Sequence, residues 1–366
     1  MDRNFQDLLK RYNEGRVSPE EKKQVESWYL ALGEKPKVIN QDALLTQLED
    51  GKQELQQLYR QNRVAPIWRR AVAVAAVLLV ALGFYLTRGT DQESDLPLVS
   101  IDSIQPGEEN AIFSMENGEA LDLRTMVVGT KLNQGGVEIV KLATGGIQIN
   151  QTGTATVQSS TIKTPRGGEF EVTLPDGSLV KLNADSELKL LAGYNKDNRR
   201  IDLSGEAFFD VQKSTKPFIV STANQKVTVL GTQFNIKAYA SEAETTTKLL
   251  RGSVKVSNNT SGKEVLMKPG DQVINRGDEL LVSSKEKQQV DWVDKEFVFN
   301  EKTAEELMND IARWYNLEVE FENEDLKNKR FTGSIARYSE FTKVIAVLEA
   351  TEVLKFQLEG RKILVK

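Results

Sequence analysis

The sequence predicts a multidomain protein with an N-terminal α-helical segment, one transmembrane helix, an all-β domain and a C-terminal α+β domain of two βαβ units. Three observations predict this organisation. One uncharged apolar run occupies residues 71–87, 19 of the 25 glycines lie between Gly89 and Gly277, and helical periodicity returns after Phe297. The expected parts are a helical segment at 1–66, a transmembrane helix at 69–88, a linker at 89–103, an all-β domain at 104–292 and a C-terminal domain at 295–366.

Composition excludes several classes of protein. The 366 residues exceed one ordinary domain. A content of 28% charged and 39% hydrophobic residues is unlike the composition of a polytopic membrane protein. The chain has no cysteine and no histidine, which excludes disulfides, thiol catalysis, a histidine-based triad and the usual zinc sites. A net charge of −5 without a basic block does not indicate nucleic-acid binding. We therefore expect no cofactor, no metal and no enzymatic activity.

The N-terminal segment, residues 1–66, is expected to form three amphipathic helices. The motif SPEE at Ser18 combines an N-cap serine, a proline at the first helical position and a glutamate three residues after the cap. So short a segment buries a marginal core, so it forms either a self-contained bundle or a set of arms that fold on a partner. In the second case the binding side chains are those of the apolar stripes, namely Leu8, Leu9, Tyr12, Val25, Trp28, Tyr29 and Leu32.

The apolar run at 71–87 predicts a membrane-spanning helix. Its 17 residues reach about 25 Å as a helix, slightly less than a hydrocarbon core of about 30 Å. Arginines at 69, 70 and 88 can extend to the headgroups and complete the span. Positive charges cluster on its N-terminal side and acidic residues on its C-terminal side, so the N-terminus is expected in the cytoplasm. A buried core helix is the alternative, but such a helix rarely lacks a polar stripe.

Short alternating runs between glycine and proline turns predict an all-β domain, built as a sandwich or as a short solenoid. It contains a duplicated strand-turn-strand unit, because PGEENAIFSMENGEALDL at 106–123 matches PRGGEFEVTLPDGSLVKL at 165–182 at a constant offset of 59. Each copy carries Asn-Gly or Asp-Gly between apolar runs, which is typical of a two-residue type I′ hairpin turn. We expect the two copies to stack.

The C-terminal region repeats a strand-helix-strand plan at an offset of 37. In FVFNEKTAEELMNDIARWYNLEVEF, Leu307, Ile311 and Trp314 are expected to face inward from the helix. Its open sheet edges could accept a partner strand, and we select Phe331, Thr332, Gly333 and Ser334 as candidate receptor-binding residues.

The motifs TPRGGEFEVTLPDGSLVKLNADSEL, LSGEAFFDVQKSTKPFIVSTANQKVTVLGTQFNIKAY, LLRGSVKV and MKPGDQ, with the C-terminal strand-helix-strand stretch, resemble FecR-like transmembrane anti-sigma factors of the Bacteroidetes type. The resemblance covers nearly everything from residue 164 onward. It implies a periplasmic β domain followed by a domain similar to the short N-terminal domain of secretins and TonB-dependent receptors.

The same resemblance implies a function. The cytoplasmic helices would sequester an extracytoplasmic-function sigma factor, and the periplasmic part would bind the signalling domain of a TonB-dependent outer-membrane receptor. The chain would then be a single-pass inner-membrane protein with a cytoplasmic N-terminus and a periplasmic C-terminus, and membrane proteases would release the sigma factor. The alternative is a membrane-tethered periplasmic binding or structural β protein without a sigma partner.

Some relatives of this family cleave themselves at a Gly-Thr bond, and Gly231-Thr232 occupies the matching position. A hydroxyl nucleophile usually needs a positioned base, and the chain has no histidine to supply one. Either strain at Gly231 replaces that base, or Thr232 is an ordinary packed strand residue. The missing base favours the second interpretation.

Overall fold

The computed structural model of the protein describes residues 18, 20, 101–115, 120–153, 156–285 and 289–366. The described residues from 101 onward belong to one compact unit. Within the described ranges, no helix has both the length and the apolarity needed to cross a membrane. The predicted N-terminal helices and the predicted span at 71–87 lie outside these ranges.

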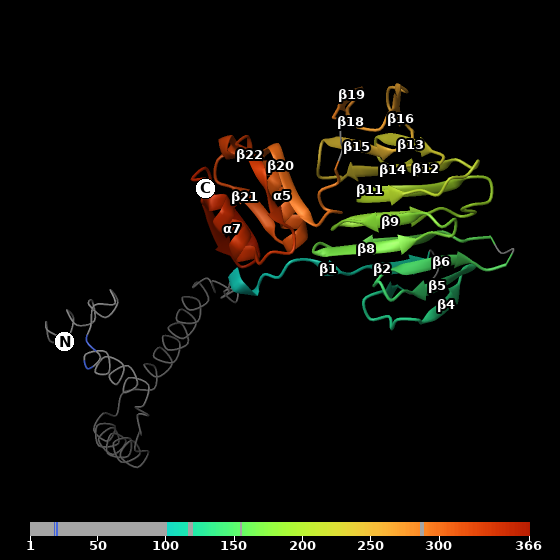
Figure 1. Ribbon diagram of the computed structural model, residues 1–366, viewed down its shortest axis with the longest axis horizontal. Coiled ribbons are helices and arrows are strands. Elements are labelled where there is room, and N and C mark those ends of the chain that lie inside the picture. Colours follow the sequence, from blue (N-terminus) through green and yellow to red (C-terminus); the bar gives the residue numbers. More distant parts are fainter. Residues whose placement is uncertain (1–17, 19, 21–100, 116–119, 154–155, 286–288) are drawn as a thin grey trace, which may run out of the picture. The chain divides into compact units, whose positions relative to one another are not determined.

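The strands of the β domain, coloured from teal to yellow-brown in Figure 1, form two sheets. The alternating buried side chains of the two sheets meet in one continuous apolar core. In spatial order, the first sheet contains β3 (Leu121–Asp122), β2 (Ile112–Met115), β7 (Ser160–Thr164), β10 (Ser186–Leu190), the first half of β11 (Arg199–Asp210), β12 (Phe218–Ser221), β13 (Gln225–Val229), β16 (Val254–Asn258) and β17 (Glu264–Met267). The second contains β4 (Lys131–Gln134), β5 (Val137–Lys141), β6 (Ile147–Gln151), β8 (Gly168–Thr173), β9 (Leu179–Leu182), the second half of β11, β14 (Gln233–Ala238), β15 (Glu244–Arg251), β18 (Asp271–Arg276) and β19 (Glu279–Ser284).

One strand, β11, joins the two sheets. Its first part pairs with β10 and β12, and from Gly205 onward it pairs with β9 and β14. Gly205 has φ +95°, and a Cβ added there would lie 2.6 Å from the Ser186 Cα. Only glycine allows both this backbone conformation and this close approach. The strand therefore changes sheets at a residue that has no side chain.

Both copies of the duplicated unit form a strand pair, but the pairs lie in different sheets. In the first copy β2 pairs with β3 in the first sheet, and in the second β8 pairs with β9 in the second sheet. The expected type I′ turn at Asp176-Gly177 is wrong. Gly177 has φ +83°, but Asp176 is not among the residues with positive φ, and Gly177 N–H donates to the Leu174 carbonyl at 2.8 Å. Pro175 favours the first central position of an ordinary turn, so Gly177 becomes the left-handed residue that follows it.

The C-terminal domain has its own apolar core. Its elements, shown from orange to red in Figure 1, are β20 (Glu296–Thr303), α5 (Ala304–Tyr315), β21 (Glu318–Phe321), α6 (Glu324–Lys327), β22 (Arg330–Ala336), α7 (Phe341–Glu349), β23 (Phe356–Glu359) and β24 (Lys362–Val365). Helix α5 begins at a capping box in which Thr303 and Glu306 satisfy each other's backbone N–H groups. Leu307, Ile311 and Trp314 are buried, as their spacing predicts.

The strand-helix-strand order occurs twice, but its strands do not form βαβ units. β20 pairs antiparallel with β22, whereas β21 pairs parallel with β24, which also pairs with β23. The strands of the first half, β20 and β21, therefore take their partners from the second half, whereas β23 and β24 pair with each other within that half. The offset of 37 predicts the order of elements but carries no information about which strand edges meet.

Candidate functional site

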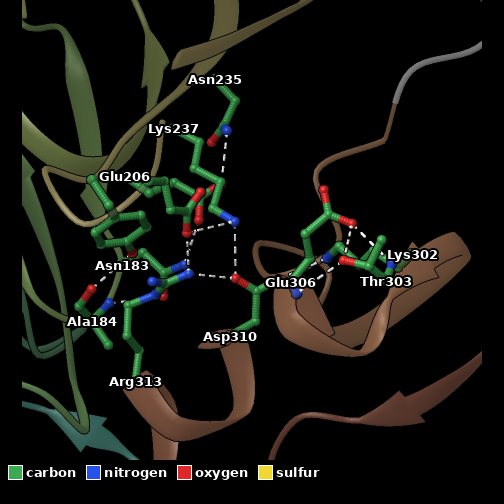
Figure 2. Close-up of polar contacts among 12 residues, drawn as sticks. Asn183, Ala184, Glu206, Asn235, Lys237, Lys302, Thr303, Glu306, Asp310 and Arg313 are labelled. Atoms are coloured by element: carbon green, nitrogen blue, oxygen red, sulfur yellow. Dashed lines mark hydrogen bonds and ion pairs between the residues drawn. The ribbon is translucent and has the colours of Figure 1, made fainter. Parts of the chain in front are cut away.

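A cluster of charged side chains lies where the β domain meets the C-terminal domain (Figure 2). Asp310 of α5 accepts from three cations: Lys237 of β14 at 3.0 Å, Lys302 of β20 at 2.7 Å and Arg313 of α5 at 2.7 Å. Glu242 of the β domain completes the cluster, at 2.6 Å from Arg313 and 3.1 Å from Lys237. We call these five residues the junction cluster. It joins two carboxylates and three cations across the domain boundary.

Local structure explains how each side chain reaches the cluster. Asp310 and Arg313 are three residues apart in α5, so they share one helix face and form an intrahelical pair. Lys237 lies near the end of β14, a strand that pairs with the second half of β11. The Arg313 guanidinium also lies over the ring of Tyr239, 3.9 Å from its centroid. Ion pairing and cation–π contact therefore both fix Arg313 against the β domain.

Electrostatics keep the cluster ionised. Burial disfavours a charged Asp310, but Lys237, Lys302 and Arg313 outweigh it and hold the pKa of this carboxyl well below its usual value. Burial likewise opposes the charge of Lys237, yet Asp310 and Glu242 raise the pKa of its ammonium group. The pKa of Arg313 is raised in the same way by Asp310 despite burial. Asp310, Lys237 and Arg313 are thus charged throughout the physiological pH range.

A second polar layer lies beneath the junction cluster and is centred on Glu206 of β11. The carboxylate of Glu206, which is only 9% exposed, accepts from Asn183 Nδ2 at 2.8 Å and from Asn235 Nδ2 at 2.9 Å. Asn235 Oδ1 in turn accepts from the indole N–H of Trp292 at 3.2 Å. The two amides supply the hydrogen bonds that the buried Glu206 carboxylate needs, without a cation in direct contact. Both amides must therefore be held in place.

A buried arginine, Arg337, connects this layer to the C-terminal domain. It is 2% exposed and lies over the ring of Trp314, 3.8 Å from the centroid, and it donates to Asn183 Oδ1. Trp314 donates its indole N–H to the Arg337 carbonyl at 2.8 Å. Burial lowers the pKa of Arg337 against the opposing effect of Glu169. Its guanidinium therefore acts as a planar, charged packing element between the domains.

The arrangement is suited to holding two domains together rather than to catalysis. Its ionisable groups are paired, and among the residues that the structure describes no group of three or more acidic side chains is placed to hold a metal ion. Elsewhere in the β domain, Asp176 pairs with the fully buried Arg199 at 2.8 Å, and the Asp176 side chain is 6% exposed.

The residues predicted from sequence lie elsewhere. Leu8, Leu9, Tyr12, Val25, Trp28, Tyr29 and Leu32 are outside the described residues. The receptor candidates 331–334 lie on β22, where Phe331 is buried, Thr332, Gly333 and Ser334 are exposed, and Thr332 Oγ1 donates to Glu301 at 3.2 Å. Thr232 is 2% exposed, and its hydroxyl donates to the Ser253 carbonyl at 3.0 Å. Thr232, which directly precedes β14, is therefore packed and hydrogen-bonded.

Sequence reasoning did not identify the junction cluster or Arg337. The i, i+3 pair Asp310 and Arg313 was the available signal, but such pairs are common on exposed helix faces. The Asp310 partner of Lys237 and the Asn183 partner of Arg337 are 73 and 154 residues away, so the sequence carries no local signal for these two contacts. Only the docking of the two domains brings these groups together.

Comparisons with known proteins agree with this division. The family model described as "FecR protein" matches residues 160–255, and the one described as "FecR, C-terminal" matches residues 296–365. Two crystal structures of a "putative anti-sigma factor" from Parabacteroides distasonis, at 1.65 and 2.50 Å resolution, are similar with TM-scores of 0.52 and identities of 28% and 27%. The similarity covers 56% and 57% of this chain and 98% of each of those chains. No curated protein matches.

Proposed function

Because the chain belongs to the FecR family, we propose that it is an anti-sigma factor of the inner membrane that sequesters an extracytoplasmic-function sigma factor. In this proposal residues 1–66 bind the sigma factor in the cytoplasm, residues 71–87 cross the membrane, and the two described domains lie in the periplasm. The chain is a regulator and not an enzyme.

One observation carries the proposal: the two family matches fall in the two structural domains, one in each. The first match runs from the start of β7 into β16, and the second from the start of β20 to the end of β24. Ahead of them the sequence supplies the two parts that a transmembrane regulator needs, an apolar run at 71–87 and amphipathic stripes within 1–66.

We further propose that the C-terminal domain binds the signalling domain of a TonB-dependent receptor. The two-stranded sheet β20–β22 supports this, because among the described residues neither strand has a ladder partner on its outer edge. An added strand could pair there through backbone hydrogen bonds, with the exposed Thr332 and Ser334 at the edge. The junction cluster would then transmit receptor binding to the β domain.

A reporter assay tests the sigma-binding half. The full chain is co-expressed with a candidate extracytoplasmic-function sigma factor and a promoter that this factor reads. We expect repression by the full chain, release when residues 1–66 are deleted, and at least partial release for the double substitution Trp28→Ala and Tyr29→Ala, which removes the predicted aromatic anchors. The matched control is Lys22→Ala with Lys23→Ala in the same segment.

The same assay distinguishes the proposed anti-sigma function from the alternative one. A membrane-tethered β protein without a sigma partner predicts the same reporter signal with and without residues 1–66. Topology is measured separately, by protease treatment of spheroplasts. If the C-terminal domain stays protected there, the proposed membrane orientation is wrong.

A further inference from the structure

The segment at residues 101–107, which we call the latch segment, packs through its two isoleucines on the core of the C-terminal domain rather than on the β domain that follows it in the chain. It begins with the 3₁₀ turn η1 (Ile101–Ser103), which contacts α7 and lies beside it in Figure 1. Ile104 is 2% exposed and belongs to the apolar core of the C-terminal domain, and Ile101 packs against the same core. The chain therefore uses residues near the start of the described region to complete a core formed near its C-terminus.

The two isoleucines are placed for this contact by the turn. Residues i and i+3 of a 3₁₀ turn project from the same side, and the Ile104 N–H donates to the Ile101 carbonyl at 3.3 Å. The latch segment contains no lysine or arginine. It thus presents two apolar side chains on one side of a short turn, and the matching surface is the apolar core between α5 and α7.

The end of the latch segment is held equally closely. A Cβ added at Gly107 would lie 2.6 Å from the indole ring of Trp314, so only a glycine passes beneath that ring. The next residue, Glu108, donates its N–H to the Gly167 carbonyl at 3.0 Å, and Gly167 donates to the Arg313 carbonyl at 2.7 Å. The segment is therefore enclosed where the two domains meet, and it is anchored on both of them.

We propose that this surface of the C-terminal domain is a peptide-binding site whose occupant is the chain's own latch segment. While the site is occupied, the side chains of Ile101 and Ile104 are held against the C-terminal core, where a protease cannot engage them. Release of the segment exposes them without unfolding the β domain. The regulatory consequence, that a receptor which loosens the C-terminal domain exposes the tether to a membrane protease, rests on the function proposed above. The binding site itself does not.

Limited proteolysis of the full chain in mild detergent tests the proposal. Thermolysin cleaves before isoleucine, so cleavage before Ile101 is measured by mass spectrometry in the wild type and in Ile104→Ser, a variant that keeps this bond. Burial of an isoleucine side chain stabilises the closed state enough that we expect cleavage to become about 10- to 100-fold faster. In the reciprocal variant, Ile101→Ser, cleavage before Ile104 should also become faster, by a smaller factor because Ile101 is only half-buried.

Two controls separate release of the latch segment from loss of stability. Ile112→Ser changes an isoleucine that is 43% exposed in β2, and Val273→Ala weakens the β core far along the chain. Neither should accelerate cleavage before Ile101 by more than about twofold, on the principle that local and global opening are separate processes. Equal acceleration by Val273→Ala, or none by either latch variant, would overturn the proposal.

A binding experiment tests the site directly. A fluorescent peptide of residues 97–107, PLVSIDSIQPG, should bind the full-length Ile104→Ser variant at least tenfold more tightly than the wild type, whose site is occupied in cis. The same peptide with serine at both isoleucine positions should not bind. Equal affinity for the wild type and the variant would contradict a latch that occupies the site. No sigma factor or receptor is present in either experiment, so their outcome is independent of the proposed transcriptional role.

Discussion

Replacing Asp310 by asparagine should weaken the contact between the two domains more than any other single charge substitution at the junction. The change keeps the shape of the side chain but removes the only carboxylate that all three cations contact. Removing one partner of a buried pair typically costs about 3–5 kcal/mol. Asp310 is 18% exposed, and Glu242 still neutralises Lys237 and Arg313, so we expect a loss of about 2–4 kcal/mol.

The pH dependence of this loss is distinctive. The pKa of Asp310 in the folded protein lies well below its usual value of 3.8, since the three cations outweigh the effect of burial. The stabilisation is therefore fully present above the unfolded pKa and is lost as the pH falls through the folded pKa. The difference in unfolding free energy between wild type and variant should be constant near pH 7 and should shrink below about pH 4.

Thermal unfolding followed by tryptophan fluorescence measures this difference, because Trp292 and Trp314 are buried at the junction. A loss of about 2–4 kcal/mol should lower Tm by roughly 5–12 °C. The matched control is Asp278→Asn, at an exposed residue between β18 and β19. An Asp310→Asn variant as stable as the control, or a stability difference that persists unchanged at pH 3, would refute the assignment of the cluster as a charged interdomain lock.

Three further outcomes are expected. Arg337→Ala should lower the unfolding free energy, measured in urea, by about 3 kcal/mol. Arg337→Met should lower it by less than about 1.5 kcal/mol, because methionine restores packing on Trp314 without a buried charge. Equal losses would argue against a packing role. Gly205→Ala should lower the unfolding free energy by about 2 kcal/mol or more, and the control Gly129→Ala should lower it by about 1 kcal/mol. Both glycines have positive φ, but only Gly205 faces a close backbone atom. On a denaturing gel the purified chain should run as one intact band, because the Thr232 hydroxyl is buried and already donates to a carbonyl. Thr232→Val should leave that band unchanged. Two fragments that disappear in the variant would instead establish self-cleavage.

Several features could be predicted from the sequence because their causes are local. The capping pair Thr303 and Glu306 and the inward spacing of Leu307, Ile311 and Trp314 lie within one helix, so α5 follows from its own residues. The all-β character between residues 104 and 285 follows likewise from alternation and glycine-rich turns. Even there, the expected turn was placed one residue too late. Pro175 takes the first central position of the observed turn and Asp176 the second, so Gly177 follows these two positions.

The sequence by itself determined the kinds and order of the elements, because hydrophobic periodicity and turn chemistry act over a few residues. Only the tertiary structure decided which strands pair, that Gly205 is the point where β11 changes sheets, that Asp310 meets three cations, and that Arg337 is buried. The tertiary structure also decided that Ile104 completes the core of a domain that begins almost two hundred residues later. Burial and charge pairing depend on which surfaces meet, and docking of the two domains sets these contacts between residues far apart in the chain.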